Sequence, residues 1–256
     1  MGLCVTIVCR NEAQEIGACL ESVRWADEIV VCDSGSTDGT LEICRGYTDR
    51  LYVDPWRGFS GHKNLALERA TQEWVFSLDA DERVTPALAA EIREVLADAG
   101  ARDGYTVPRK NYFLGQWIRH GGWYPDRTVR LVRRGKGSFQ PRAVHEAMRV
   151  DGSVGQLRHP FDHFTYRSLS AYLQRMDRYS TLAADELWQG GRRARISDLC
   201  LRPPATFLRM YLLRAGFRDG TAGLILAGLY AAQTLAKYAK LWERGSREAH
   251  LQSPDG

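Results

Sequence analysis

The sequence lacks the glycine-rich motifs with which many α/β proteins bind phosphate groups. Neither G-x-G-x-x-G nor G-x-x-x-x-G-K-[S/T] occurs in the 256 residues, which disfavours a dinucleotide-binding Rossmann domain and a P-loop. H-E-x-x-H is also missing, because Ala147, Met148 and Arg149 follow Glu146, and this disfavours a zinc protease. Phosphate handling must therefore depend on other residues, and a metal ion is the obvious candidate.

Cysteine pairs with zinc-binding or redox spacing are absent as well. Five of the six cysteines fall in the first 44 residues, mostly at apolar strand-like or helix-like positions: Cys4, Cys9, Cys19, Cys32 and Cys44. We interpret them as small buried side chains in a reducing compartment. The N-terminus enters a strand-like run without a basic segment before it, so we expect no signal peptide and no export.

Apolar runs long enough to span a bilayer are also lacking. The apolar segment 224–232 is followed by Gln233 and Lys237 before it reaches the length of about 20 residues that a spanning helix needs. Hydrophobic residues make up 44% and charged residues 26% of the chain, which is typical of an ordinary globular protein rather than a disordered one. A chain of this length can form one large domain, or one domain with an appendage.

The net charge of +4 is mildly basic and unevenly distributed. Basic residues cluster in two places, Arg127, Arg130, Arg133, Arg134 and Lys136, and then Arg192, Arg193 and Arg195. Such clusters suit phosphates or an anionic membrane, although a solvated surface arginine is the commoner explanation for any one of them.

Short apolar runs alternate with helical patterns in the first 100 residues. Strand-like runs occupy 3–9, 28–32, 51–53 and 74–78, and segments with helical spacing follow them, including 65–70 after an expected loop at 58–64. Thr85-Pro86 is typical of a helix start. This alternation predicts right-handed βαβ units and a mainly parallel sheet.

Four polar loops follow these strands, namely 10–12, 33–40, 57–64 and 79–82. Ligands of open α/β sheets bind beyond the carboxyl ends of the strands, so one crevice could collect all four loops. Asp79 and Asp81 would lie on one face of a continuing strand and could hold Mg²⁺ or Mn²⁺. Acidic residues in this position often only cap the next helix, so D-x-D alone would favour the simpler explanation.

Together these motifs resemble family 2 glycosyltransferases of the GT-A fold. The resemblance rests on Asn11-Glu12, the segment Asp33-Ser34-Gly35-Ser36-Thr37-Asp38-Gly39-Thr40, Lys63-Asn64 and Asp79-Ala80-Asp81 in this order. It covers about the first 150 residues, and the combination is specific although each member alone is weak. It implies a nucleotide-sugar donor, a divalent metal and transfer with inversion at the anomeric carbon.

The resemblance also assigns roles to individual residues. Asp33 matches the nucleoside-binding carboxylate, Asp79 the acid that faces the ribose or donor sugar, and Asp81 the metal ligand. Lys63 matches a contact to the donor phosphate or nucleoside. We expect the rest of the donor site to comprise Arg10, Asn11, Glu12, Gly35, Ser36 and Asp38. This sequence has Asp33-Ser34 where many relatives have two aspartates.

The second half of the chain offers candidates for a base and a further metal ligand. An inverting transfer needs a base for the acceptor hydroxyl, and the subgroup that this chain resembles carries a His-Glu pair after an Arg-Leu strand, which indicates Glu146. Asp126 is the rival. A histidine after D-x-D often completes the metal shell of GT-A enzymes, which indicates His163, with His159 as the alternative and a structural role open for both.

Aromatic residues cluster in a glycine-rich loop between two strand-like runs. They are Trp117, Trp123 and Tyr124, and they could bind sugar faces or fill a core equally well.

Residues 166–245 predict a helical extension. Basic residues alternate there with Phe207, Tyr211, Phe217, Tyr238 and Trp242, which suits helices lying on an anionic membrane. A helical subdomain or a dimer surface explains the pattern equally well. We expect a GT-A catalytic domain at 1–165, with donor binding in about 1–100 and the acceptor side in about 101–165, and a flexible tail at 246–256.

The expected function is transfer of a sugar from a UDP-sugar, with UDP-glucose as the expected donor, to a lipid-linked saccharide such as the lipopolysaccharide inner core. The resemblance to enzymes of that pathway places the protein in the cytoplasm, peripherally on the inner membrane. A sugar nucleotidyltransferase and a non-catalytic nucleotide-sugar-binding or scaffold protein are the alternatives. The pattern predicts no nucleic-acid partner and no particular oligomeric state.

Overall fold

The computed structural model describes residues 1–140, 147–166 and 168–252. These residues form two compact units. The first comprises residues 1–111 and 125–165, and the second comprises residues 112–124 together with those from 166 onward.

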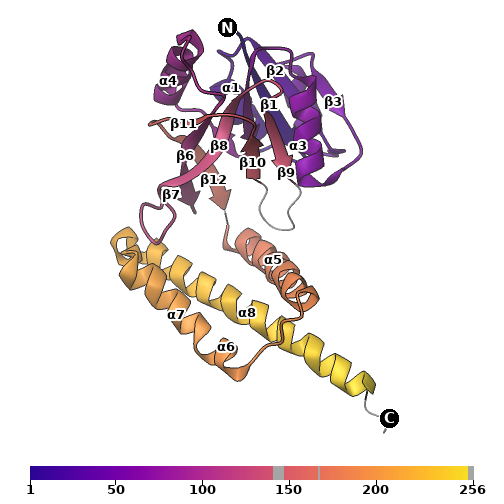
Figure 1. Cartoon of the computed structure of the whole chain (residues 1–256), viewed down its shortest axis with the longest axis vertical. Helices are drawn as coiled ribbons and strands as arrows, with labels where there is room; N and C mark the ends of the chain where they lie inside the picture. Colours follow the sequence, from indigo (N-terminus) through magenta and orange to yellow (C-terminus); the bar gives the residue numbers. More distant parts are fainter. Residues whose placement is uncertain (141–146, 167, 253–256) are drawn as a thin grey trace. The chain divides into compact units, whose positions relative to one another are not determined.

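A twisted sheet forms the centre of the first unit (Figure 1). Strand β1 (Leu3–Cys9) pairs in parallel with β2 (Glu28–Asp33) and β4 (Trp74–Asp79), and β2 pairs in parallel with β3 (Leu51–Val53). Strand β8 (Asp126–Arg133) continues the sheet antiparallel to β4. The remaining strands are β6 (Gly104–Phe113), β12 (Phe161–Tyr166), β5 (Glu82–Arg83), β7 (Gln116–Trp117) and β11 (Val154–Gln156), with β9 (Gly137–Gln140) and β10 (Ala147–Val150) forming a separate antiparallel pair.

Apolar side chains cover both faces of this sheet, as expected for buried parallel strands. Leu3, Val5 and Ile7 share one core with α1 (Ile16–Ser22) and α4 (Pro86–Ala97). On the other face, Cys4 and Val30 share a core with α3 (Gly58–Arg69) and with the β9–β10 pair. Helix α2 (Thr40–Arg45) adds Cys44 to the first core. The five N-terminal cysteines are free and buried.

Helix α3 differs from the sequence prediction, because it begins at Gly58 and not at Leu65. The glycines at 58 and 61 suggested a loop, but His62 and Ala66 lie four residues apart and are both buried, which a helix achieves and a loop does not. Gly58 has a φ of +76°, which glycine adopts without strain as the chain enters the helix. Lys63 therefore projects from a helix.

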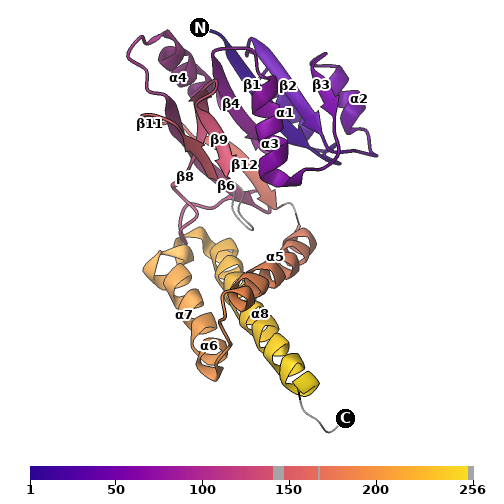
Figure 2. The ribbon, with the colours of Figure 1, turned by 45° about the vertical axis from the view of Figure 1, so that its right-hand side comes forward.

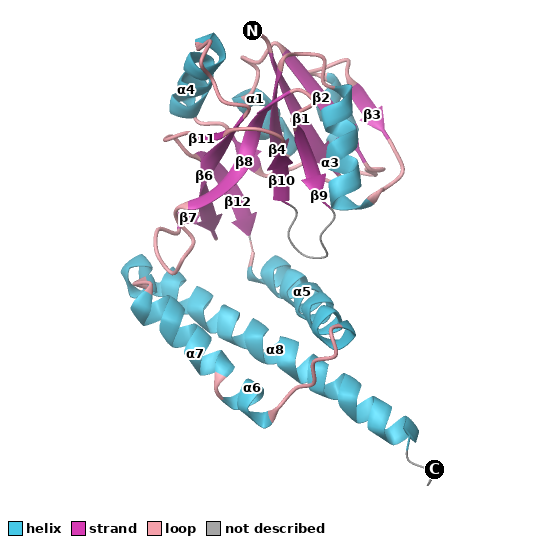
Figure 3. Ribbon diagram, viewed as in Figure 1, coloured by secondary structure: helices cyan, strands magenta, loops and turns pink. Residues whose placement is uncertain are grey.

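The second unit consists mainly of helices joined by short loops, together with residues 112–124 (Figures 2 and 3). Its described elements are α5 (Leu169–Gln189), α6 (Ile196–Cys200), α7 (Arg202–Leu208), the π-helical turn η1 (Arg209–Leu213), the 3-10 turn η2 (Gly216–Asp219) and α8 (Gly220–Gln252). Phe113, Trp123, Tyr172 and Met210 form its core with Leu226. Trp123 is thus a core residue of this unit, the second of the two explanations that the sequence left open.

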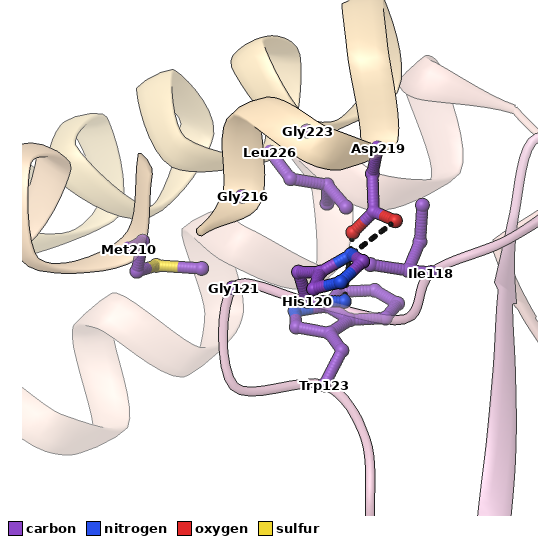
Figure 4. Close-up of a pocket in the computed structure, with 9 residues that line it drawn as sticks. All are labelled: Ile118, His120, Gly121, Trp123, Met210, Gly216, Asp219, Gly223 and Leu226. Atoms are coloured by element: carbon purple, nitrogen blue, oxygen red, sulfur yellow. Dashed lines mark hydrogen bonds and ion pairs between the residues drawn. The ribbon is translucent and has the colours of Figure 1, made fainter. Parts of the chain in front are cut away.

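A buried carboxylate joins residues 112–124 to the helices of their unit (Figure 4). Asp219 accepts hydrogen bonds from the backbone N–H of His120 at 2.8 Å and of Arg119 at 3.2 Å, and it contacts Nδ1 of His120 at 3.0 Å. The small cavity beside this contact is lined mainly by apolar and glycine residues. The arrangement explains why residues 112–124, which the sequence analysis grouped with the first domain, cluster with the helices.

The C-terminal end also differs from expectation. Helix α8 continues to Gln252, so residues 246–252 of the expected tail are helical, whereas 253–256 lie outside the described residues. In the described part of the chain, none of the helices combines the length and the hydropathy that crossing a membrane requires.

Candidate active site

The loops after β1 and β2 are joined by hydrogen bonds at one edge of the sheet. Asn11 has a left-handed φ of 55°, its backbone N–H donates to Oγ of Ser36 at 2.7 Å, and its Oδ1 accepts from the N–H of Thr37 at 2.8 Å. The N–H of Glu12 donates to Oγ1 of Thr40 at 2.8 Å. These bonds hold the two predicted donor loops as one surface.

Asp33 shapes the second of these loops from within. The residue is fully buried, and its Oδ1 accepts from the backbone N–H groups of Gly35 at 2.8 Å and Ser36 at 2.7 Å. Its Oδ2 accepts from the hydroxyl of Ser36 and from Sγ of Cys9 at 3.4 Å. The carboxylate thus fixes the turn that starts the predicted nucleoside site.

Asp38, which is exposed, extends the hydrogen-bond network of the two loops. Its Oδ1 accepts from the N–H of Thr40 at 3.0 Å, and its Oδ2 accepts from the N–H of Ala13 at 3.2 Å. The hydrogen bonds from Thr40 lower the pKa of Asp38. Arg10 is exposed directly after β1, where a bound anion could reach it.

Asp79 lies between two cations at the end of β4. Nζ of Lys63 is 2.8 Å from Oδ1 of Asp79, and Nη2 of Arg130 is 3.0 Å from its Oδ2. Burial alone would raise the pKa of Asp79, but the two cations outweigh this effect and hold the pKa well below its usual value. Asp79 is therefore ionised and fixed in orientation.

Glu82 and Arg130 form a buried ion pair beneath the D-x-D segment, which the sequence analysis did not identify. Nη2 of Arg130 is 2.5 Å from Oε1 of Glu82, and Oε2 of Glu82 accepts from the backbone N–H of Asp79 at 2.9 Å. Burial raises the pKa of Glu82, an effect that Arg130 opposes and Asp79 reinforces. Arg130 was grouped with a basic surface cluster, but it is only 4% exposed, so that interpretation is wrong for this residue.

The depressed pKa of Asp79 predicts a pH-dependent contribution to stability. As pH falls below 3.8, the ordinary pKa of an aspartate, the Asp79 carboxylate is protonated in the unfolded chain before it is protonated in the folded protein. The stability that ionised Asp79 contributes is therefore complete at pH values well above 3.8, and it is lost as pH falls toward the pKa of Asp79 in the folded protein. We expect Asp79→Asn to reduce the free energy of unfolding at pH 7 more than at about pH 3. Urea unfolding at both pH values measures this, and an equal reduction at both would contradict the depressed pKa.

Asp81 and His163 are brought together by pairing of β5 with β12. His163 lies opposite Glu82 in this antiparallel pair, and the N–H of Phe164 donates to the backbone oxygen of Asp81 at 3.0 Å. Nε2 of His163 is consequently 3.4 Å from Oδ2 of Asp81. Two residues that are 82 positions apart in the sequence thus lie side by side, which the predicted shared metal site requires.

Asn111 and Thr165 both contact Nδ1 of His163. Nδ2 of Asn111 donates to Oδ2 of Asp126 at 3.3 Å, so Oδ1 of Asn111 is the atom that faces Nδ1 of His163, at 2.6 Å, and the hydroxyl of Thr165 lies 3.0 Å from the same nitrogen. When Nδ1 carries the proton of the neutral ring, Nε2 presents a lone pair toward Oδ2 of Asp81, and one metal ion could bind both atoms. When the ring is protonated on both nitrogens, it pairs with Asp81 directly.

The pair fits part of a metal shell. Two atoms bound side by side to one ion at about 2.1 Å lie about 3 Å apart, which is close to the observed separation. Within the described residues, no group of three or more histidine, cysteine or acidic side chains could hold a metal ion. A divalent ion at Asp81 and His163 would therefore take its remaining ligands from water and from substrate phosphates, as Mg²⁺ commonly does.

The remaining candidates are placed differently. Glu146, the expected base, lies outside the described residues. Asp126 accepts from Nε of Arg109 at 2.9 Å and from Asn111, so strong donors already occupy it. His159 is exposed, and its backbone N–H donates to Glu91 at 2.9 Å.

Comparisons with known proteins identify the family of the chain. The family model described as "Glycosyl transferase family 2" matches residues 4–163. Lipopolysaccharide core biosynthesis glycosyltransferase LpsC of Rhizobium meliloti (strain 1021) is 37% identical over 97% of this chain and 95% of its own length. An uncharacterized glycosyltransferase of Rickettsia typhi (strain ATCC VR-144 / Wilmington), RT0209, is 25% identical over 97% of this chain and 89% of its own length.

Likeness to solved structures is more distant. The mannosyltransferase PcManGT of Pyrobaculum calidifontis, solved with GDP-Man and Mn2+, has a TM-score of 0.48 and 19% identity over 98% of this chain and 81% of that one. The family assignment therefore rests on the matched family model and on the relative that is 37% identical. Both confirm the resemblance, the sheet of β1 to β4 with its helices confirms the predicted α/β architecture, and the chain belongs to glycosyl transferase family 2.

Proposed function

We propose that this glycosyltransferase moves a sugar, with inversion, from a UDP-sugar to a lipid-linked saccharide of the lipopolysaccharide core type, using Mg²⁺ or Mn²⁺. UDP-glucose is the donor that we would test first. The observation that carries the proposal is the approach of Nε2 of His163 to Oδ2 of Asp81, at 3.4 Å, beside the ionised Asp79. The name of the relative that is 37% identical supports the acceptor class, and with such an acceptor we expect the reaction at the cytoplasmic face of the inner membrane.

The donor would bind across the joined loops after β1, β2 and β4. Asp33 and Asn11 hold the nucleoside side of this surface through the loop contacts described above. Lys63 and Arg130 fix the carboxylate of Asp79 for the ribose or donor sugar. Asp81 and His163 would hold the divalent ion, which supplies positive charge for the leaving diphosphate.

In the transfer step, the acceptor oxygen forms a bond to the anomeric carbon while the bond from that carbon to the diphosphate oxygen breaks. The electron pair of the broken bond leaves with the nucleoside diphosphate. A base takes the proton of the acceptor hydroxyl, and Glu146 is our candidate because Asp126 already accepts from Arg109.

Product analysis tests the proposal. The protein is incubated with a panel of nucleotide sugars, Mn²⁺ and a lipid-linked core saccharide, and the linkage formed is determined by NMR. We expect transfer from one UDP-sugar, with an anomeric configuration opposite to that of the donor. Binding of a nucleotide sugar without transfer to any acceptor would favour a non-catalytic binding protein, and absence of both would overturn the proposal.

The same assay tests the choice of base. We expect Glu146→Gln to lower kcat by about 100-fold or more, because a positioned base contributes that much to proton transfer. Asp126→Asn is the matched control and should have a clearly smaller effect. If Asp126→Asn causes the larger loss, the base is Asp126 and the role of Glu146 is wrong.

A further inference from the structure

Residues 199–218 of the helical unit combine a high apolar content with a single sign of charge. This stretch contains four arginines and no aspartate or glutamate. The acidic residues that flank it, Asp198 and Asp219, are both buried and bonded within the unit. The stretch begins at the end of α6 and continues through α7, η1 and most of η2. Helix α7 lies along α8 (Figure 2), and η1 and η2 also contact α8.

One side of this segment is packed and apolar. Met210 is buried in the core of the unit, and Phe207 and Tyr211 pack against that core. Pro203 is also buried. The spacing of 203, 207 and 210 is that of one helix face, so this face accounts for how the segment is held on α8.

The opposite side is equally apolar but exposed. Leu201, Leu208 and Leu212 recur at helical spacing on it, with Leu201 65% exposed and the other two about half exposed. Leu213, at 83%, and Phe217, at 50%, extend the exposed set. A surface helix normally carries polar side chains on the face that points away from the core, and these five exposed positions are all apolar.

Three exposed arginines border this face, namely Arg209, Arg214 and Arg218. No ion pair joins any of them to another described residue, whereas Arg202 pairs with Asp198 at 2.5 Å. We define the 201–218 surface as Leu201, Leu208, Leu212, Leu213 and Phe217 together with these three arginines. Long arginine side chains can keep their charge at an interface while apolar neighbours enter it.

This surface differs from the one that the sequence pattern indicated. Tyr238 is buried, and Nζ of Lys240 is 2.6 Å from Oδ1 of Asp177. Phe207 and Tyr211 pack inward. Of the aromatic residues expected to face a membrane, Phe217 lies on the 201–218 surface, and the leucines that supply most of the surface were not part of that prediction.

We propose that the 201–218 surface docks on an anionic lipid bilayer, with its leucines in the interface and its arginines at the headgroups. Such a segment lies in the plane of the interface and does not cross it. The bordering charges favour lipid over a second copy of the chain, because a two-fold interface would bring the same arginines against one another. The inference deepens the proposed function by naming the surface that brings the enzyme to a lipid-linked acceptor, and it rests on that function for its biological purpose.

Vesicle flotation tests the docking without using transferase activity. The full chain is mixed with vesicles of phosphatidylcholine alone, or of phosphatidylcholine with phosphatidylglycerol at two to one. We expect binding to the anionic vesicles, weakened by salt. The double variant Leu212→Glu/Leu213→Glu should bind these vesicles at least about tenfold more weakly. Val154→Glu, at a 44% exposed position of the first unit, is the matched control and should bind like wild type.

A second variant tests the charges. Arg209→Gln/Arg218→Gln should reduce binding to anionic vesicles by about tenfold and leave the weaker binding to neutral vesicles unchanged. Circular dichroism and donor hydrolysis without acceptor check that each variant is folded and has an intact donor site. If the wild-type protein shows no donor hydrolysis, that result counts against the proposed function and not against docking.

Three results would overturn the docking proposal. The first is wild-type protein that fails to float with anionic vesicles, and the second is a leucine variant that floats as well as wild type. The third is a wild-type dimer in light scattering that the leucine variant converts to a monomer while vesicle binding stays the same, which would make the surface an interface between copies of the chain.

Discussion

Asp81→Asn is expected to lower kcat/KM for donor turnover by about 1000-fold, because the variant removes one of the two side chains proposed to hold the metal. The substitution keeps the size of the side chain and removes only its charge. Release of nucleoside diphosphate from the UDP-sugar, at a series of Mn²⁺ concentrations, measures the effect. The variant should also need a higher Mn²⁺ concentration for half of its residual activity.

Asp162→Asn is the matched control for this variant. Asp162 lies next to His163 on β12, but its Oδ1 is 3.4 Å from Nζ of Lys110. We expect it to retain most of the activity and an unchanged Mn²⁺ requirement. Equal losses in the two variants, with no change in the Mn²⁺ dependence of either, would contradict the metal role of Asp81.

Arg130→Met is expected to reduce the free energy of unfolding by about 3–5 kcal/mol, because it leaves Glu82 buried without its cation. Asp79 loses a partner as well. Urea unfolding at neutral pH measures the loss. The double variant Glu82→Gln/Arg130→Met should recover part of it, since it removes the uncompensated carboxylate.

Arg133→Met provides the control on the same strand. Arg133 pairs with the exposed Glu73 and lies over the ring of Trp74, and an exposed pair contributes about 1 kcal/mol or less. If Arg130→Met costs no more than Arg133→Met, the buried pair does not stabilise the turn that carries Asp79 and Asp81.

The first half of the fold and the position of its loops could be predicted from the sequence. Short apolar strands that alternate with helices form a parallel sheet. In a parallel sheet the loops after β1, β2 and β4 lie together at the edge where these strands end. The expectation that Asp81 and His163 share a metal site came from the family resemblance. No local pattern contains it, because it depends on pairing between β5 and β12.

Other features depend on contacts that a local pattern does not contain. Arg130 and Glu82 are 48 residues apart and meet because β8 joins the sheet beside β4. A signal did exist, since Arg130 lies between Val129 and Leu131 in a strand-like run. The predicted start of α3 was wrong because the low helix propensity of glycine was given more weight than the helical spacing of His62 and Ala66. The sequence alone could not show which side of α7 is exposed and which is packed, because both sides are apolar.

Calorimetric titration of the protein with UDP, with and without Mn²⁺, shows whether a metal ion links Asp81 to the donor diphosphate. We expect Mn²⁺ to tighten UDP binding in wild type by about tenfold or more, and we expect Asp81→Asn to remove this gain while UDP alone still binds weakly. If UDP binds wild type equally well without Mn²⁺, or if Asp81→Asn keeps the full gain, then Asp81 and His163 do not hold a metal ion that contacts the donor diphosphate.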